Sequence, residues 1–162
     1  MALARHHGGW VIAFTLIAAL MLAVTPLPDW AAPLRPEWPA LVLIYWCLAL
    51  PQRTGVATGW VVGLFLDVLR GALLGQHALA FAIIAYLTIK LHRRIRVFPL
   101  WQQSLSVMVF VALQQLLALW IDGMSGAPTR GWSYWLPTLT SAVLWPWLFV
   151  LLRALRREFR VT

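Results

Sequence analysis

The chain has 162 residues, of which 62% are hydrophobic and only 11% are charged. Soluble domains carry about 25% charged residues, so this composition excludes an ordinary soluble protein and indicates an integral membrane protein. Thirteen basic residues outnumber five acidic ones, and because they cluster at the ends of apolar runs they favour contact with anionic lipid over nucleic-acid binding.

Six apolar runs predict an all-α bundle of six membrane-spanning helices in a single polytopic domain, residues 1–162. The expected spans are residues 10–26, 38–51, 54–71, 75–90, 102–121 and 133–152, followed by a basic cytoplasmic tail at 153–162. The first run follows a basic start, as a signal peptide does, but its length and the apolar segments after it favour a retained span. Four prolines lie between the first two runs, so this connection should be extended.

The second run is short for a membrane span. A helix from Trp38 to Leu50 covers about 20 Å, whereas the hydrocarbon core is about 30 Å thick. It is either a re-entrant element or a full span whose first turn contains Pro39. The distribution of charge favours a full span.

Six spans place both termini on one side of the membrane. With the N-terminus inside, the inner segments hold ten basic residues: Arg5, Arg53, Lys90, Arg93, Arg94, Arg96, Arg153, Arg156, Arg157 and Arg160. The outer segments hold three: Arg35, Arg70 and Arg130. This asymmetry predicts cytoplasmic N- and C-termini, because cytoplasmic loops carry the excess of Lys and Arg.

A ladder of small residues runs through the third span, TGVATGWVVGLFLDVLRGALLGQH (residues 54–77). Its rungs are four residues apart: Gly55, Gly59, Gly63, Asp67, Gly71 and Gly75. Each step of four residues turns the helix by about 40° beyond a full turn, so the first three glycines form an inclined groove. Small residues at this spacing let two helices approach closely. We expect this face, with Asp67, to pack against another helix of the chain or to receive a helix of another protein.

The rest of the ladder is expected to form a polar latch and a turn at the outer end of the bundle. Asp67 lies three residues before Arg70 and can pair with it, while Gln76 and His77 at the start of the next span can reach Asp67 across the turn. A proton relay or a binding site is the functional alternative. Gly71 suits a helix C-terminus and Gly75 a tight turn.

The sequence contains no recognisable catalytic or metal-binding pattern. No two histidines share a helix at a spacing of four, no two acids are paired on one helix, and no serine inside a span lies beside a base. Gln114 and Gln115 lie deep in the fifth run and are expected to bond across helices. We therefore predict no enzyme activity, no cofactor and no metal.

Two basic clusters mark the predicted cytoplasmic side. The first consists of Lys90, Arg93, Arg94 and Arg96. The second consists of Arg153, Arg156, Arg157 and Arg160, which recur at the spacing of one helical face. Such a face suits an anionic inner leaflet, so both clusters are predicted to contact lipid or to anchor the topology.

Several short motifs between residues 35 and 79 resemble one family. They are RPEWP at 35–39, Tyr45-Trp46, PQRTG at 51–55, GLFLDVLRG at 63–71 and LGQHAL at 74–79. In these motifs, and in overall length and span layout, the chain is similar to the rod shape-determining protein MreD family.

This resemblance implies a non-enzymatic scaffold in the bacterial cytoplasmic (inner) membrane. Its expected direct partner is MreC, and MreB, RodA and a penicillin-binding transpeptidase are expected in the same complex for lateral peptidoglycan synthesis and rod shape. The resemblance also implies a fold similar to the substrate-binding S subunits of energy-coupling-factor transporters. A fold does not fix a function.

Without the family resemblance, the residues also permit other functions. A small-molecule transporter or its substrate-binding subunit would use Asp67, Gln76 and His77 to line a pocket. An enzyme acting on lipid-linked wall precursors would need polar groups converging at one depth, which a ladder with a single acid does not predict.

Overall fold

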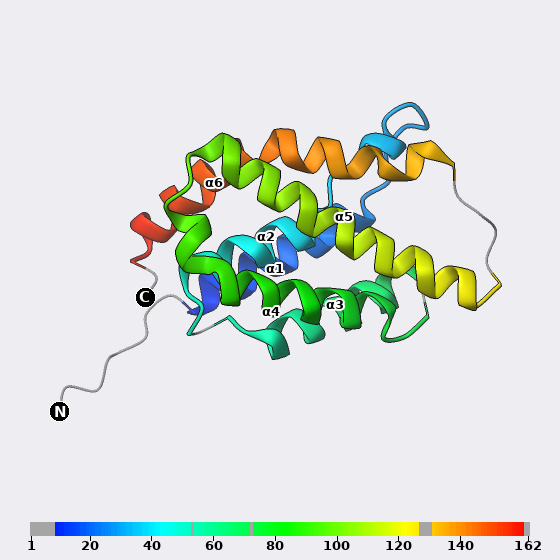
Figure 1. The fold of residues 1–162 in the computed structure, drawn as a ribbon, viewed down its shortest axis with the longest axis horizontal. Helices are drawn as coiled ribbons and strands as arrows, with labels where there is room; N and C mark the ends of the chain where they lie inside the picture. Colours follow the sequence, from blue (N-terminus) through cyan, green and yellow to red (C-terminus); the bar gives the residue numbers. More distant parts are fainter. Residues whose placement is uncertain (1–8, 53, 72, 127–130, 161–162) are drawn as a thin grey trace.

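The computed structural model describes residues 9–52, 54–71, 73–126 and 131–160, apart from the side chain of Pro33. Within these ranges the chain forms six α-helices, two short 3₁₀ helices and no strand, so the predicted all-α class with six helices is confirmed (Figure 1). The α-helices are α1 (Gly9–Val24), α2 (Trp38–Ala49), α3 (Val56–Arg70), α4 (Gln76–Arg96), α5 (Leu100–Met124) and α6 (Leu136–Glu158). The 3₁₀ helices are η1 (Ala32–Leu34) and η2 (Trp132–Trp135).

Among the described residues, two stretches are long and apolar enough to cross a membrane by length and composition, namely α5 and the continuous stretch from η2 to the end of α6. The helices α1 and α2 are apolar but shorter. Helix α4 continues through the basic stretch as far as Arg96, and α6 continues through most of the expected tail to Glu158. The basic clusters therefore belong to helices of the bundle, apart from Arg160, which follows α6.

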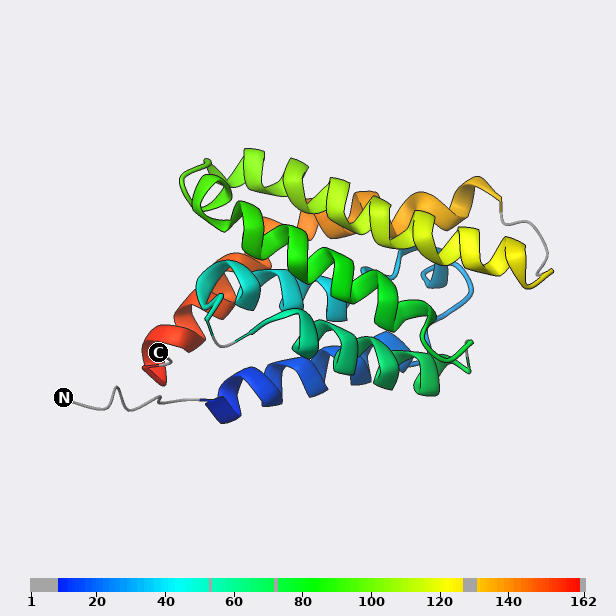
Figure 2. The ribbon, with the colours of Figure 1, turned by 60° about the horizontal axis from the view of Figure 1, so that its bottom comes forward.

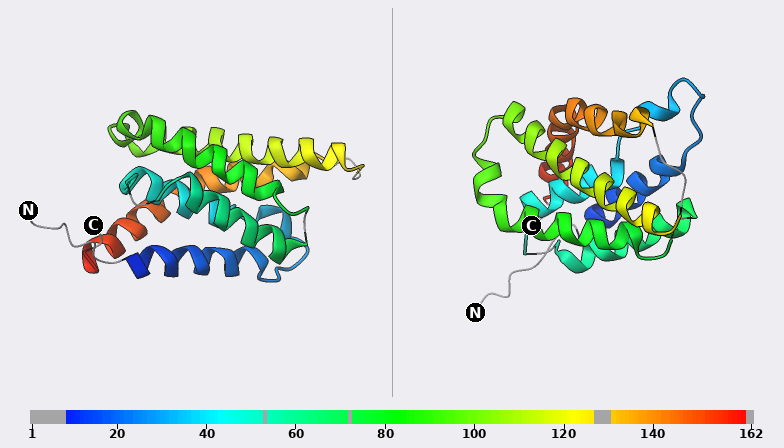
Figure 3. Two further views of the ribbon diagram at one scale, coloured as in Figure 1. Left: turned by 90° about the horizontal axis from the view of Figure 1, so that it is seen from below. Right: turned by 45° about the vertical axis from the view of Figure 1, so that its right-hand side comes forward.

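The centre of the bundle is α2. Every residue from Pro39 to Ala49 is buried, and the helix contacts α1, α4, α5 and α6. Figure 2 and the left view of Figure 3 show α1 on one side of the molecule and α5 on the other, with α2 and α3 between them. A helix that is apolar all round is stable only when neighbours cover it, which explains this position. One hydrogen bond ties it to α1, from Trp46 Nε1 to Thr15 Oγ1 at 2.9 Å.

Successive helices run in opposite directions, so the bundle has two distinct ends. The start of α1 and the end of α6 meet at one of them, where the rings of Trp10 and Phe159 lie 5.0 Å apart (Figure 2). We call this the basic end, because Lys90 and seven arginines lie there, in the C-terminal parts of α4 and α6 and just after α6: Arg93, Arg94, Arg96, Arg153, Arg156, Arg157 and Arg160. Arg5, Arg53 and Arg130 lie outside the described residues.

The opposite end, which we call the acidic end, gathers four of the five acids of the chain. They are Asp29, Glu37, Asp67 and Asp122, with Arg35 and Arg70 beside them. Helices α1, α3 and α5 end here, and α2, α4 and α6 begin here.

The closest helix pair is α3 and α4, because two glycines of α3 touch the backbone of α4. A Cβ added at Gly59 would lie 2.7 Å from the carbonyl oxygen of Phe81. One added at Gly63 would lie 2.5 Å from the carbonyl oxygen of His77. Nothing lies within 4 Å of the Cβ position of Gly55, so this glycine takes no part in the contact.

A short turn joins these two helices, and two of its glycines adopt the left-handed region. Gly71 follows the end of α3 with φ of 65°, and Gly75 precedes α4 with φ of 99°. Side chains with a Cβ are disfavoured in both conformations. These two rungs of the ladder therefore shape the turn, whereas Gly59 and Gly63 make the helix contact.

Candidate functional site: a polar ring at the acidic end

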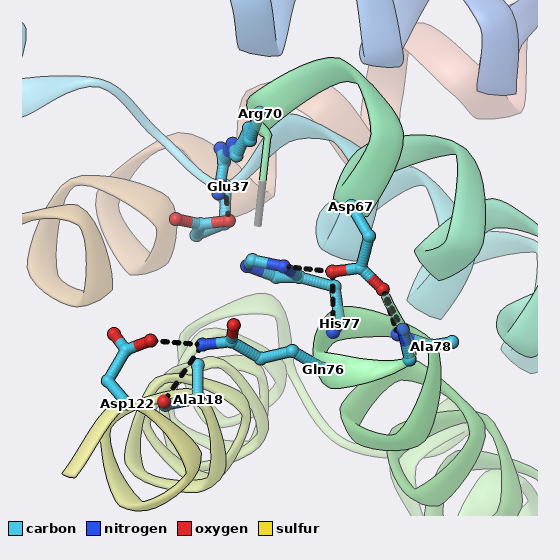
Figure 4. A network of polar contacts seen from close by, with 9 residues as sticks. Glu37, Asp67, Arg70, Gln76, His77, Ala78, Ala118 and Asp122 are labelled. Carbon is cyan, nitrogen blue, oxygen red and sulfur yellow. Dashed lines mark hydrogen bonds and ion pairs between the residues drawn. The ribbon is translucent and has the colours of Figure 1, made fainter. Parts of the chain in front are cut away.

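Asp67 is fully buried at the acidic end and binds the start of α4 (Figure 4). Its carboxylate accepts the backbone N–H of Gly75 and of His77, each at 2.9 Å, and that of Ala78 at 3.4 Å. The ring nitrogen Nδ1 of His77 lies 2.8 Å from the same carboxylate. The first N–H groups of a helix have no partner inside it, and the residue before α4 is a glycine without a capping side chain. Asp67 supplies the missing cap from the neighbouring helix.

Arg70 pairs with Glu37, which precedes α2, and not with Asp67. The Nη2 atom of Arg70 lies 3.7 Å from Oε2 of Glu37. The pairing of Arg70 with Asp67 permitted by their three-residue spacing is wrong, because the oxygens of Asp67 are taken up by α4. Gln76 also differs from the expectation, since its side chain turns away from Asp67. Its Nε2 donates to the carbonyl of Ala118 at 2.9 Å and to Asp122 at 2.8 Å, both on α5.

Further polar contacts connect α5 to α6 and α6 back to α2. Gln115 donates to the carbonyl of Tyr134 at 3.0 Å and accepts from the hydroxyl of Thr138. The backbone N–H of Glu37 donates to Ser141 Oγ at 3.0 Å. With Glu37–Arg70, Asp67–His77 and Gln76–Asp122, these contacts form a closed ring through α2, α3, α4, α5 and α6. We call this set of contacts the polar ring.

The first helix joins the polar ring through Arg35. Its two terminal nitrogens donate to the carbonyls of Ala23 and Thr25 at the end of α1. The last carbonyls of a helix have no partner inside it, so a guanidinium placed there caps the helix and complements its dipole. Every helix of the bundle is therefore held at the acidic end by a polar side chain.

The polar ring surrounds a cavity of about 1210 Å³ that opens at the acidic end. Its wall contains residues from α1, η1, α3, α4, α5, η2 and α6 and from the segments between them. The polar ones are Arg35, Glu37, Arg70, Gln76, His77, Gln114, Gln115, Asp122, Ser125, Ser133 and Tyr134. In Figure 4 the ring of His77, the side-chain oxygen of Gln76 and the carboxylate of Glu37 point toward one space. The arrangement presents hydrogen-bonding groups from several helices to one open volume.

Two of the predicted basic residues make contacts inside the bundle. Arg96 donates to the carbonyls of Leu48 and Ala49 at the end of α2, both at 2.6 Å, and so caps that helix. Arg156 interacts with the phenol of Tyr45 in α2. The other six predicted lipid-contact residues are exposed: Lys90, Arg93, Arg94, Arg153, Arg157 and Arg160.

The structure thus brings Asp67, Arg70, Gln76 and His77 to one end. The expected contact of His77 with Asp67 is confirmed, whereas Arg70 and Gln76 have partners that the sequence did not predict. Sequence reasoning missed Arg35, Glu37, Ser141 and Asp122 as members of the polar ring. The sequence did contain a signal for three of them. Arg35, Glu37 and Asp122 are charged and flank apolar runs on the same predicted side of the membrane. Among the described residues, no three His, Cys, Asp or Glu side chains are grouped so that they could hold a metal ion.

Comparison with known proteins assigns the chain to a family. A family model described as rod shape-determining protein MreD matches residues 4–155. The rod shape-determining protein MreD of Haemophilus influenzae is 34% identical over 151 residues, which cover 93% of this chain and 93% of that protein. No solved structure matches the chain, and the similarity to S subunits stays a prediction. Since the similarity extends over almost the full length of both proteins, this chain belongs to the MreD family of rod shape-determining proteins.

Proposed function

We propose that this protein is a non-enzymatic scaffold of the bacterial inner membrane that binds MreC and supports lateral cell-wall synthesis. MreB, RodA and a penicillin-binding transpeptidase act in the same complex. The observation that carries this proposal is membership of a rod shape-determining family over nearly the whole chain. A bundle whose helices are tied to one another at both ends suits a component that other proteins dock against.

The proposal includes six membrane crossings with both termini in the cytoplasm. Its structural support is the outward surface, where many large apolar side chains are exposed on every helix except α2. Examples are Phe14 on α1 (65%), Val68 on α3 (68%), Trp120 on α5 (65%) and Val143 on α6 (78%). A soluble monomer rarely exposes so much apolar surface, whereas lipid tails cover it without cost. The basic end then faces the cytoplasm, as the positive-inside rule requires.

The site at which a partner helix docks differs from the Gly groove considered in the sequence. Helix α4 fills that groove at Gly59 and Gly63, so it is closed to another protein. A single membrane helix of MreC therefore docks on an outward face, with its periplasmic stem near the acidic end.

Site-specific photocrosslinking in cells tests this docking. A photoreactive amino acid replaces Phe14, Trp60, Trp120 or Val143, which are exposed on four different helices. We expect crosslinks to MreC from one or two neighbouring faces and not from the others. The scaffold role would be contradicted if, at all four positions, crosslinks to MreC were no stronger than those to an unrelated membrane protein.

The cavity favours a second candidate function, a transporter or its substrate-binding subunit. That function predicts a small molecule bound to the purified protein and specific uptake by cells. In a deletion strain, loss of rod shape with normal uptake favours the scaffold. An uptake defect in cells that keep their shape favours the transporter.

A further inference from the structure

The cavity at the acidic end contains acceptors that the surrounding helices leave unpaired. Gln114 is 1% exposed and Glu37 is 7% exposed, and both line the cavity. Among the described residues, Oε1 of Gln114 and Oε2 of Glu37 have no hydrogen-bond partner. Arg70 lies 3.7 Å from that oxygen of Glu37, which is close enough for attraction but too far for a hydrogen bond. Buried acceptors without a donor are unfavourable, and a carboxylate is the least favourable of them.

His77 adds a third acceptor to the same wall. Its Nδ1 faces the carboxylate of Asp67, which already accepts backbone N–H groups, so Nδ1 carries the proton and donates. In a neutral imidazole the other nitrogen, Nε2, is then an acceptor. His77 lines the cavity, and Figure 4 shows its ring pointing toward the space beside Glu37. By accepting the hydrogen bond from Nδ1, Asp67 leaves Nε2 of His77 as the acceptor that faces the cavity.

The wall also holds donors. The terminal nitrogens of Arg35 donate to carbonyls of α1, and its Nε is unpaired among the described residues. Arg70 lies beside Glu37, attracted to it but not hydrogen-bonded. The volume, about 1210 Å³, is ample for a side chain or a small molecule, since ligand pockets commonly measure about 300 to 1,000 Å³. The cavity therefore complements a group that donates several hydrogen bonds.

We propose that this cavity binds a cationic group with several N–H donors, an ammonium or a guanidinium, held by Glu37 and Gln114 with His77 as a third acceptor. Glu37 supplies the opposite charge, and the two neutral acceptors fix the orientation. An ammonium offers three donors and a guanidinium five, and bonds between charged partners are the stronger ones. The group belongs to a free amine or to a Lys or Arg side chain of a partner protein, because both present the same donors.

Thermal unfolding of the purified full-length protein in phosphatidylcholine nanodiscs tests the site. The probe is argininamide, which carries a guanidinium and an α-ammonium. Its control is Nα-acetylcitrullinamide, in which a neutral urea replaces the guanidinium and an amide replaces the ammonium. We expect a saturable rise in Tm with argininamide and an affinity at least about tenfold weaker for the neutral control. Equal responses to the two compounds, or no saturable response to argininamide, would overturn the proposal.

Three variants locate the site. Glu37→Gln should abolish the response to argininamide, whereas Glu158→Gln removes the same charge from an exposed position at the basic end and should leave the response unchanged. Gln114→Leu removes an acceptor that is unpaired among the described residues, so the protein should still fold while the affinity for argininamide falls about tenfold. A response that survives in both Glu37→Gln and Gln114→Leu contradicts the site.

Co-purification with MreC distinguishes the two sources of the cationic group, and this measurement alone rests on the proposed scaffold function. If the group is a partner's side chain, Gln114→Leu lowers the yield of MreC and argininamide competes with it. If the group is a free amine, the yield of MreC is unchanged while argininamide still binds the purified protein. Failure to bind MreC at all removes the scaffold proposal and leaves the binding measurement on the purified protein standing.

Discussion

At the scale of single residues, Asp67 replaces the capping side chain that α4 lacks. A glycine precedes α4 because the turn needs a left-handed residue there, and a glycine cannot cap with its own side chain. The carboxylate of Asp67 accepts three backbone N–H groups and the Nδ1–H of His77, so the positive end of the helix dipole and these hydrogen bonds stabilise its charge. Helix end and carboxylate therefore stabilise each other.

Replacing Asp67 by Asn should destabilise the bundle by about 2 to 3 kcal/mol, because hydrogen bonds to a charged acceptor become neutral and one oxygen becomes a donor facing N–H groups. Unfolding by SDS in mixed micelles measures the change. Asp29→Asn, at an exposed position of the same end, is the matched control and should lie within about 0.5 kcal/mol of the wild type. Equal losses in the two variants would show that Asp67 acts only through overall charge.

A pair of variants also distinguishes the capping role of Arg96 from the role of the exposed arginines beside it. Arg96→Gln should lower the free energy of unfolding by about 1 to 2 kcal/mol, because two carbonyls at the end of α2 lose a charged donor. Arg93→Gln, at an exposed position one turn earlier, should change it by less than about 0.5 kcal/mol. Both variants are measured in zwitterionic lipid, where contact with anionic headgroups contributes nothing. Equal free energies of unfolding for the two variants would contradict the capping role of Arg96 and favour lipid contact.

At the scale of elements, the α3–α4 pair is organised by close backbone approach at Gly59 and Gly63. In lipid there is little hydrophobic driving force between helices, so such close contacts carry much of the association. The polar contacts of Asp67 lie directly beyond the second glycine, where the two helices join through the turn. Packing and capping thus act on the same pair of helices.

Gly63→Ala should push α3 and α4 apart, because the added Cβ would lie 2.5 Å from the backbone oxygen of His77. The expected loss is about 1 to 3 kcal/mol, or failure to accumulate in the membrane. Gly55→Ala is the control, since its Cβ would meet nothing within 4 Å and should leave the amount of inserted protein unchanged. Membrane levels and SDS unfolding are the two measurements, and a tolerated Gly63→Ala would contradict the packing.

The sequence predicted six helices and a close-packing face on the third of them, because apolar runs and small residues at regular spacing are local patterns. It did not predict that Gly55 lies outside the contact or that α4 is the helix in the groove. It also did not predict the partners of Arg70 and Arg96, which lie 33 and 47 to 48 positions away along the chain. Spacing identifies neighbours on one helix, whereas these contacts depend on how helices are arranged in space.

At the scale of the whole molecule, charge is separated along the bundle. The basic end holds eight of the ten described basic residues, and the acidic end holds four of the five acids. This separation was predictable from the sequence, because it follows from the order of charges and apolar runs alone. The polar ring and its cavity were not predictable from the sequence, because they depend on how six helix ends meet at the same end of the bundle.

Cysteine labelling tests the orientation of this charge axis in the membrane. In a Cys47→Ala background, Ser125→Cys at the acidic end should react with a membrane-impermeant maleimide added from the periplasmic side. Arg160→Cys at the basic end should react only after the inner membrane is permeabilised. The reverse pattern would invert the proposed topology. If Ser125→Cys and Arg160→Cys were both labelled from the same side, α6 would not cross the membrane once between them.

The shortness of α2 has an electrical consequence. Its twelve residues cover about 18 Å, against a hydrocarbon core of about 30 Å, and the cavity begins beside Glu37, where the helix starts. With the proposed orientation, in which the acidic end faces the periplasm, solvent that enters the cavity would bring the outer potential to the start of α2, and most of the voltage would fall across this helix. The field along α2 would then be stronger than that in the surrounding lipid.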